Sequence, residues 1–470
     1  MSSTKDQLLL RIRQHGKLST VEQLRLTALL SLPAILAQLS SILMFYIDDA
    51  MVGSLGAQAS ASIGIVATSM WLFWSIISCA ATGFSVQVAH RVGANDLDGA
   101  RSIFRQSLLA SLALAVVTGL AGAFISQPLP HWLGGEEAIC GDASTYFLIF
   151  TLGAPLAMID MLASAMLRCA GNIKVPSMAN IVMCILDVCF NFFLIFPTRT
   201  LDVLGHDILV PGAGLGVAGA AIGTLTAEGV IALYLLWYAT TRCPELRLRG
   251  LRGSFVPERP VLGEAADIAA PILLQRVLMN VAQITITVIV APLGAVAIAA
   301  NALGITAESL CYMPGYGIGE AATTLVGQSY GAGRYRLTER FAWMTTLLGI
   351  AVMTVMGAVM YVAAPLMMAS LTPDEAVRQL GTECLRIEAW AEPGFAASIV
   401  AMSCFVGAGD TRKPAMMNLF SMWAVRVTLV ALLAPRYGLQ GVWLGMAVEL
   451  TFRGIIFLAR MKWGRWRNEE

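Results

Sequence analysis

Hydrophobic positions dominate this chain in long continuous runs, and short polar segments separate each run from the next. The runs are about as long as the ~20 apolar residues that a helix needs to cross the hydrocarbon core of a bilayer. The pattern therefore predicts an all-α integral membrane protein with twelve transmembrane helices. They are expected over residues 27–53, 58–84, 103–128, 143–169, 176–197, 217–240, 262–292, 296–325, 338–368, 382–407, 414–434 and 440–461.

The polar segments between the runs alternate in charge. Basic residues follow the even-numbered runs, as Arg334, Arg336 and Arg340 do, and acidic residues such as Asp374 and Glu375 follow the third, fifth and ninth runs. Basic loops are retained on the cytoplasmic side of a membrane. The alternation therefore predicts a multi-pass protein of the cytoplasmic (inner) membrane with both termini in the cytoplasm.

The first half of the chain recurs in the second half at an offset of 238 residues. Pro33 falls on Pro271, and Leu55-Gly56-Ala57 falls on Leu293-Gly294-Ala295. The same offset aligns Gly93 with Gly331, Pro155 with Pro393, Gly171 with Gly409, Pro176 with Pro414 and Asn180 with Asn418. Six helices per copy in the same orientation predict two six-helix lobes, as in parallel repeats related by an axis along the membrane normal.

The repeat and the polar segments together predict the domain organisation. A polar stretch from Ser19 to Gln23 offers a capping box that would start the first membrane helix, and a longer outer loop is expected at about 198–213. The predicted parts are a cytoplasmic lead-in (1–26), an N-lobe (27–241), a cytoplasmic linker (242–261), a C-lobe (262–463) and a cytoplasmic tail (464–470).

Composition agrees with a membrane protein and excludes some classes of partner. The chain is 57% hydrophobic and 13% charged, with a mean hydropathy of +0.71. Its net charge of +1 comes from scattered basic residues, so no nucleic-acid partner is expected. The nine cysteines and four histidines show no metal-ligand spacing.

Two adjacent carboxylates, Asp48 and Asp49, lie near the end of the first run. Each costs ~2.5–3.5 kcal/mol on insertion scales at a bilayer centre, so an acid there indicates a functional site. Asp49 points ~100° away from Asp48 on a helix, so the two candidate ion-coupling residues cannot face one cavity equally. The repeat places Ile286 and Thr287 at the equivalent positions, so the fold itself does not require acids there. A structural alternative is that the two acids only cap a helix end or face an outer vestibule.

Three polar residues of the fifth run, Asn180, Asp187 and Asn191, lie within ~40° of one another on one helical face. With Asp48 they would suit a proton or a cation. The alternative is that they join helices by interhelical hydrogen bonds.

The chain also carries a set of sequence motifs. They are Asp48-Asp49-Ala-Met-Val-Gly53, Met313–Gly317, Leu325–Ala332, the turns at Gly171 and Gly409, and Gly214–Gly219. With these motifs the chain resembles the multidrug and toxic compound extrusion (MATE) family of its bacterial type. The resemblance implies two six-helix lobes around a central cavity and a secondary active antiporter, which exports organic, cationic or amphipathic compounds in exchange for H+ or Na+ by alternating access. It also implies that Asp48 and polar residues of the fifth helix form an ion site. From it we expect a functional monomer in a lipid bilayer with small organic substrates and no cofactor beyond a coupling ion.

Four charged residues of the second copy are candidates for a substrate site or a C-lobe switch. Arg276 and Glu308 are predicted at depths that differ by ~5 Å, so they could form either a structural pair or a cavity-facing switch. Glu388 and Glu392 form an acidic stripe spaced i, i+4. Some branches of the family carry an acid in the seventh helix where this chain has Met279–Asn280, which gives more weight to coupling through Asp48.

Four large side chains, Met44, Tyr46, Trp71 and Trp74, could form a polarizable wall for flat organic cations. The alternative is that they face lipid or pack between helices.

Five more charged residues lie within predicted spans. Arg426, Glu449 and Arg453 are interpreted as an internal ion-pair network, and Asp160 and Glu228 receive no predicted role. A flippase of a lipid-linked precursor stays open as an alternative function, although it calls for a strongly cationic cavity. A membrane-embedded enzyme is disfavoured because no intramembrane catalytic motif is present.

Overall fold

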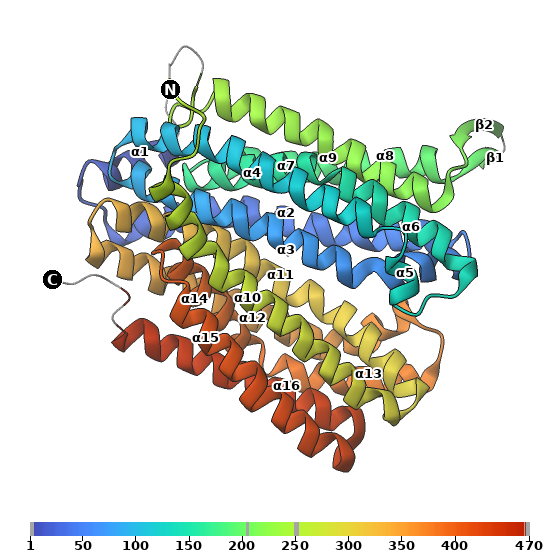
Figure 1. Cartoon of the computed structure of the whole chain (residues 1–470). Helices are drawn as coiled ribbons and strands as arrows, with labels where there is room; N and C mark the ends of the chain where they lie inside the picture. Colours follow the sequence, from blue (N-terminus) through green and yellow to red (C-terminus); the bar gives the residue numbers. More distant parts are fainter. Residues whose placement is uncertain (1–3, 204–205, 249–252, 465, 467–470) are drawn as a thin grey trace. The chain divides into compact units, whose positions relative to one another are not determined.

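The computed structural model shows a chain that is helical over almost its whole length (Figure 1). It describes residues 4–203, 206–248, 253–464 and 466. Most of the predicted tail at 464–470 therefore lies outside the described residues, as do parts of the predicted lead-in and linker.

Contacts divide the chain into two compact units. Unit 1 comprises Met1–Leu39, Ala89–Asp96 and Asp267–Glu470, and unit 2 comprises Ser40–Val88 and Leu97–Ala266. Unit 2 holds most of the predicted N-lobe, and unit 1 holds nearly all of the predicted C-lobe. The predicted lobe boundaries themselves stay predictions.

The first half of the chain forms helices where the hydrophobic runs predict them. They are α2 (Thr20–Gly53), α3 (Ala57–Gly93), α4 (Leu97–Ile125), α5 (Leu129–Trp132), α6 (Glu137–Leu152), α7 (Ala154–Cys169), α8 (Lys174–Ile195) and α9 (Gly216–Thr241). One predicted span, 143–169, is bent by 48° between α6 and α7. The bend lies at Gly153, directly before a helix start that carries a proline in its first turn, a position where the missing N–H costs no hydrogen bond.

The predicted outer loop at 198–213 is a β-hairpin instead. Its strands are β1 (Pro197–Val203) and β2 (His206–Ala213), which pair antiparallel. Threonine at the start of β1 favours a strand, and the Thr198 hydroxyl accepts a hydrogen bond from the Gly212 amide at 3.1 Å. This insertion has no counterpart in the second half of the chain.

The elements at the N-terminus and in the second half are α1 (Thr4–Arg13), α10 (Arg259–Val290), η1 (Ala291–Leu293), α11 (Ala295–Gly331), α12 (Tyr335–Leu371), α13 (Glu375–Ala389), α14 (Glu392–Gly407), α15 (Arg412–Phe420), the π-helix η2 (Ser421–Val427) and α16 (Thr428–Trp463).

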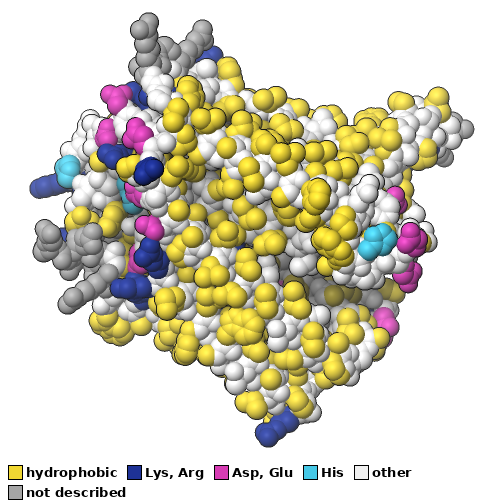
Figure 2. Space-filling model, in the orientation of Figure 1, with side chains coloured by type: hydrophobic (Ala, Val, Ile, Leu, Met, Phe, Trp, Pro, Cys, Tyr) yellow, Lys and Arg dark blue, Asp and Glu magenta, His cyan; other side chains and the backbone are white. Residues whose placement is uncertain are grey.

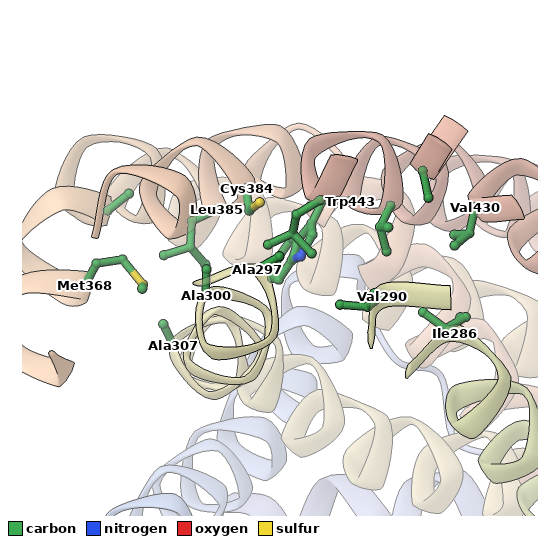
Figure 3. Packing of buried hydrophobic residues seen from close by; sticks show 14 of the residues in the cluster. Ile286, Val290, Ala297, Ala300, Ala307, Met368, Cys384, Leu385, Val430 and Trp443 are labelled. Carbon is green, nitrogen blue, oxygen red and sulfur yellow. The ribbon is translucent and has the colours of Figure 1, made fainter. Parts of the chain in front are cut away.

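Figure 3 shows how side chains from several of these helices meet in one core of unit 1. Trp443 of α16 lies in this core and is 1% exposed. Its indole N–H donates to Asn301 Oδ1 at 3.0 Å, so the large ring is buried without an unpaired polar atom.

The described helices confirm an all-α membrane protein apart from the hairpin. Nine are long and apolar enough to cross a membrane, and the bent pairs α6–α7 and α13–α14 bring the number to eleven. The last candidate, Arg412–Trp463, has 52 residues and breaks at Gly438, which has φ 59° and ψ −141°. It covers both of the last two predicted spans. The total of twelve stays a prediction.

The predicted capping box starts α2. The Ser19 amide donates to Glu22 Oε2 at 2.8 Å, and the Glu22 amide donates to Ser19 Oγ at 3.2 Å. Each side chain therefore satisfies a backbone donor that the first turn leaves free.

The outer faces of the helices are hydrophobic, as Figure 2 shows for the face in view. Along α4 the exposed fractions are 64% for Val117, 62% for Leu120 and 88% for Phe124. Water would make such a stripe costly, whereas lipid accommodates it.

Candidate functional site

An asparagine in unit 2 joins two acids that lie far apart in the sequence. Asn191 Nδ2 donates to Asp48 Oδ1 at 2.9 Å and to Asp187 Oδ2 at 3.2 Å. Both N–H groups of this one amide are thus directed at carboxylate oxygens. Asp187 and Asn191 are completely buried, while Asp48 is half-buried. The arrangement brings together three of the five predicted ion-coupling residues.

This group of residues has the properties of a site for a small cation. Two carboxylates that share one amide repel each other when both are ionised, so a proton or a cation between them stabilises the group. Asp187 Oδ1 and Asn191 Oδ1 are both buried without a hydrogen-bond partner in the described part of the chain. Carboxylate and amide oxygens are suitable ligands for hard cations.

Small residues on α9 make room for the bridging amide. A Cβ atom on Gly223 would lie 2.0 Å from Asn191 Oδ1, and one on Gly219 would lie 2.5 Å from the Leu194 carbonyl oxygen. These two glycines are spaced as Gly-x-x-x-Gly, which lets membrane helices approach closely. Thr224, the next residue on α9, interacts with the Asp187 carboxylate. The sequence predictions omit Gly223 and Thr224, although the glycine spacing is visible in the sequence.

The other two predicted ion-coupling residues lie outside this group. Asn180 Nδ2 donates to Ser41 Oγ at 2.8 Å, so it joins α8 to α2 about three turns from Asn191. Asp49 is exposed, and the amide of Asn191 donates to Asp48 and Asp187 instead. The Tyr146 phenol of α6 lies within electrostatic range of Asp48, Asp49 and Asp187 and is a further neighbour that the sequence does not reveal.

Two more acids lie in the same unit. Glu228 of α9 is 3% exposed, and its Oε2 has no hydrogen-bond partner among the described residues. Asp160 of α7 is half-buried, and its buried Oδ1 likewise has no partner in the described ranges. Glu228 interacts electrostatically with both Asp160 and Asp187. The sequence shows both acids, but only the packing of α7, α8 and α9 places them near Asp187.

The four residues of the predicted substrate wall have different surroundings. Met44 is buried, Tyr46 is half-buried, and Trp71 is 58% exposed with its ring 6.3 Å from that of Phe45. Trp74 packs against the apolar cluster around Ile77. Their role in binding substrate stays a prediction.

Unit 1 contains a second group of acids. Glu388 and Glu392 are completely buried and lie on either side of the 59° bend between α13 and α14. Both carboxylate oxygens of each residue lack a hydrogen-bond partner within the described ranges. Glu308 of α11 is also buried and acts electrostatically on both of them. The bend thus brings the predicted acidic stripe together with Glu308.

The structure does not join Arg276 to Glu308. Arg276 is exposed on α10, and no ion pair between the two residues is present in the part of the chain that the structure describes. The cation that acts on Glu308 is Arg426 instead. Helical depth alone suggests the pairing, but depth does not determine how a helix is rotated about its own axis.

The predicted ion-pair network of the last two spans is confirmed. Glu449 accepts from Arg426 and from Arg453, with closest N···O distances of 2.7 Å in both pairs, and it also accepts from the Ser421 hydroxyl. Arg426 lies in η2, and a π-helical turn often marks a functional position in a helix.

Comparison with known proteins shows that the chain matches a protein family. The family model described as MatE matches the chain twice, over residues 33–193 and 271–432. The two matches begin 238 residues apart, which is the offset of the internal repeat, and together they cover well over half of the chain. Asp48, Asp187 and Asn191 all lie within the first match.

Named relatives match over nearly the whole chain. The probable multidrug resistance protein NorM of Thermotoga maritima is 24% identical over 445 residues, covering 93% of this chain and 92% of the relative. A protein of the same name from Burkholderia pseudomallei is 27% identical over 433 residues, with 90% and 89% covered.

Solved structures show the same fold. A crystal structure of MATE in the straight conformation matches with a TM-score of 0.86 at 20% identity, covering 98% of this chain and 97% of that one. A variant of a MATE transporter from Vibrio cholerae matches with a TM-score of 0.84 at 18% identity, covering 98% of each chain.

Proposed function

Because this chain belongs to the MatE family of membrane transporters, we propose that it is a secondary active antiporter that exports small organic compounds. Members of this family are transporters and not enzymes, so the enzyme alternative is dropped. The names of the relatives, which are multidrug resistance proteins, support drugs as substrates, and we propose that these are cationic or amphipathic. The exchanged ion is H+ or Na+.

The bridge of Asn191 between Asp48 and Asp187 is the observation that carries this proposal. An antiporter needs a site that binds its coupling ion and releases it reversibly. Two carboxylates around one amide hold such an ion by charge, and loss of the ion leaves two like charges in a poorly solvated place. The energy of this group therefore depends on ion occupancy, which is what coupling to a conformational change requires.

Transport follows an alternating-access cycle. The outward-open state takes up H+ or Na+ at Asp48 and Asp187 and releases the exported compound. The loaded protein then opens inward, releases the ion and binds the next substrate. One positive charge that enters down a membrane potential of ~100 mV supplies about 2.3 kcal/mol. At ~1.4 kcal/mol per factor of ten, this maintains a gradient of a few tens-fold for a neutral substrate.

The acids of unit 1 are assigned a supporting role in this proposal. Glu308, Glu388 and Glu392 form a substrate contact or a switch that responds to charge, with Arg276 as an additional exposed cation. Their unpartnered buried oxygens support this assignment. A flippase is disfavoured because the buried groups of both sites are acidic and would repel a lipid-linked phosphate.

Membrane placement follows from the charges of the loops. We assign the protein to the cytoplasmic membrane with both termini inside the cell, because the basic loops follow the even-numbered spans. We also propose a monomer as the functional unit.

The proposal is tested by dye uptake into everted membrane vesicles. The wild-type protein is expected to accumulate a fluorescent organic cation when an acid-inside pH gradient, or a Na+ gradient at equal pH, is imposed. The gradient that drives uptake identifies the coupling ion. Asp48→Asn and Asp187→Asn keep the shape of the side chain and remove its charge, so each is expected to lower the driven rate by about tenfold or more.

The matched control is Asp142→Asn, which changes an exposed acid of α6 in the same unit. It should transport like the wild type. Full driven uptake by Asp48→Asn at equal expression would overturn the proposed coupling site.

A further inference from the structure

Two acids of unit 2, the buried Glu228 and the half-buried Asp160, have no role in the cycle described above. A carboxylate oxygen that only holds helices together needs a hydrogen-bond donor. Glu228 Oε2 and Asp160 Oδ1 are buried atoms, and neither has a donor among the described residues. Such an oxygen is costly to leave unpaired when the group is ionised, so helix packing alone does not explain why acids are present.

Helix packing places Glu228 at the level of Asp187. On α9, Gly219 packs against Leu194 of α8, and Gly223 packs one turn further along against Asn191. The residue numbers rise on α9 while they fall on α8, so the two helices are antiparallel. Another turn of ~4 residues brings Glu228 of α9 next to Asp187 of α8.

The packing of α7 on α9 places Asp160 one step further along. Leu225 of α9 contacts Gly153 of α7, and Gly229 of α9 faces Leu156 of α7. The residue numbers rise together on α7 and α9, so these two helices are parallel. By this register Asp160 lies about one helical turn, or ~6 Å, beyond Glu228 toward the end of α7 at Cys169.

We infer that Glu228 and Asp160 form a proton relay between the Asp48–Asp187 site and the far ends of α7 and α9. This inference rests on the proposed antiport function and makes H+ the coupling ion. The proton leaves the Asp187 carboxyl group and binds the Glu228 carboxylate. It then leaves Glu228 and binds Asp160, so that each group gains and loses one proton and one proton moves in total.

Charged groups from two neighbouring helices act on the two acids. Asp187 from α8 and Asp160 from α7 act on Glu228, and Arg168 from α7 acts on Asp160. Arg168 lies about two turns beyond Asp160, in the last turn of α7, so the series of acids ends near a cation at that end of the helix.

The relay is tested with purified full-length protein in proteoliposomes. Glu228→Gln and Asp160→Asn keep side-chain size and remove the exchangeable proton. Each is expected to slow pH-driven uptake of a fluorescent organic cation by about tenfold or more, because a positioned proton carrier contributes at least that much. Equilibrium binding of the same dye should stay within about twofold of wild type, since neither side chain belongs to the ion site.

Two more variants separate a relay from a packing effect. Glu228→Asp retains a carboxyl group and should recover most of the driven rate, whereas Asp142→Asn on the surface should change nothing. A folded Glu228→Asp protein that stays as slow as Glu228→Gln would overturn the relay.

Three outcomes distinguish failure of the relay from failure of the antiport proposal. If Glu228→Gln and Asp160→Asn transport normally while Asp48→Asn does not, the relay is wrong and the coupling site stands. If Na+ alone drives the wild type at equal pH, the relay is wrong and antiport stands. If Asp48→Asn also transports normally, both the relay and the proposed coupling site are wrong.

Discussion

Gly223 decides whether a single amide can reach both acids of the ion site. Its backbone lies so close to Asn191 that any Cβ atom would overlap the amide oxygen, at 2.0 Å. Asn191 is completely buried, so its side chain has no free space into which to move. The geometry of the site therefore depends on the absence of a side chain as much as on the presence of the acids.

We predict that Gly223→Ala disrupts the bridge to Asp48 and Asp187. Overpacking of this kind costs ~1–3 kcal/mol, and coupled transport should fall further than stability alone explains. Thermal unfolding in detergent and pH-driven dye uptake measure the two effects. The control is Gly229→Ala on the same helix, where the new methyl group would meet only a Leu156 methyl at 3.2 Å. Equal effects of the two substitutions would contradict this account.

At the scale of elements, bends place side chains that straight helices would keep apart. Glu388 ends α13 and Glu392 begins α14, and the 59° bend between the two helices brings their buried carboxylates to one region. Pro393 lies in the first turn of α14, where a proline is tolerated because no N–H is needed there. The position of the Glu388–Glu392 pair in unit 1 therefore depends on how the start of α13 is held in place.

The start of α13 is held by an N-cap. Asp374 Oδ1 accepts from the backbone amides of Ala376 at 2.9 Å and Val377 at 3.2 Å. Asp374→Ala is predicted to destabilise the protein by about 1 kcal/mol because both amides lose their acceptor. Asp374→Asn retains an acceptor and should be near wild type. Thermal unfolding of the two variants in the same detergent checks this, and an equally large loss in Asp374→Asn would argue against capping.

At the scale of the whole molecule, a repeated six-helix plan carries a site that is not repeated. The family model matches both halves at the same offset of 238 residues. Ile286 and Thr287 nevertheless replace the acids of the first half, and the β-hairpin formed by β1 and β2 occurs once in the described part of the chain. Duplicated architecture explains the spans, whereas the proposed ion site belongs to one half.

The proposed topology predicts which loops face the outside. Glu137→Cys, at the exposed start of α6, should react with a membrane-impermeant maleimide in intact cells. Arg336→Cys, at the exposed start of α12, should react only after permeabilisation, because its basic loop is expected in the cytoplasm. Labelling is measured in a background without native cysteines. The reverse pattern would invert the assigned orientation.

The positions of the spans, the repeat and the acids worth testing follow from the sequence. Hydrophobic length identifies a membrane helix without knowledge of its neighbours, and the cost of a charge in lipid singles out residues such as Asp48. Helical periodicity also placed Asp187 and Asn191 on one face. These inferences need only one helix at a time.

Only the tertiary structure decided which groups meet. It directed Asn191 to Asp48 and left Asp49 exposed. It brought Glu228 within electrostatic range of Asp187, and it made Arg426 instead of the exposed Arg276 the cation that acts on Glu308. Periodicity determines the direction of a side chain relative to its own helix, but not the rotation of that helix against its neighbours. Close packing at glycines such as Gly223 sets that rotation, and it depends on two helices together.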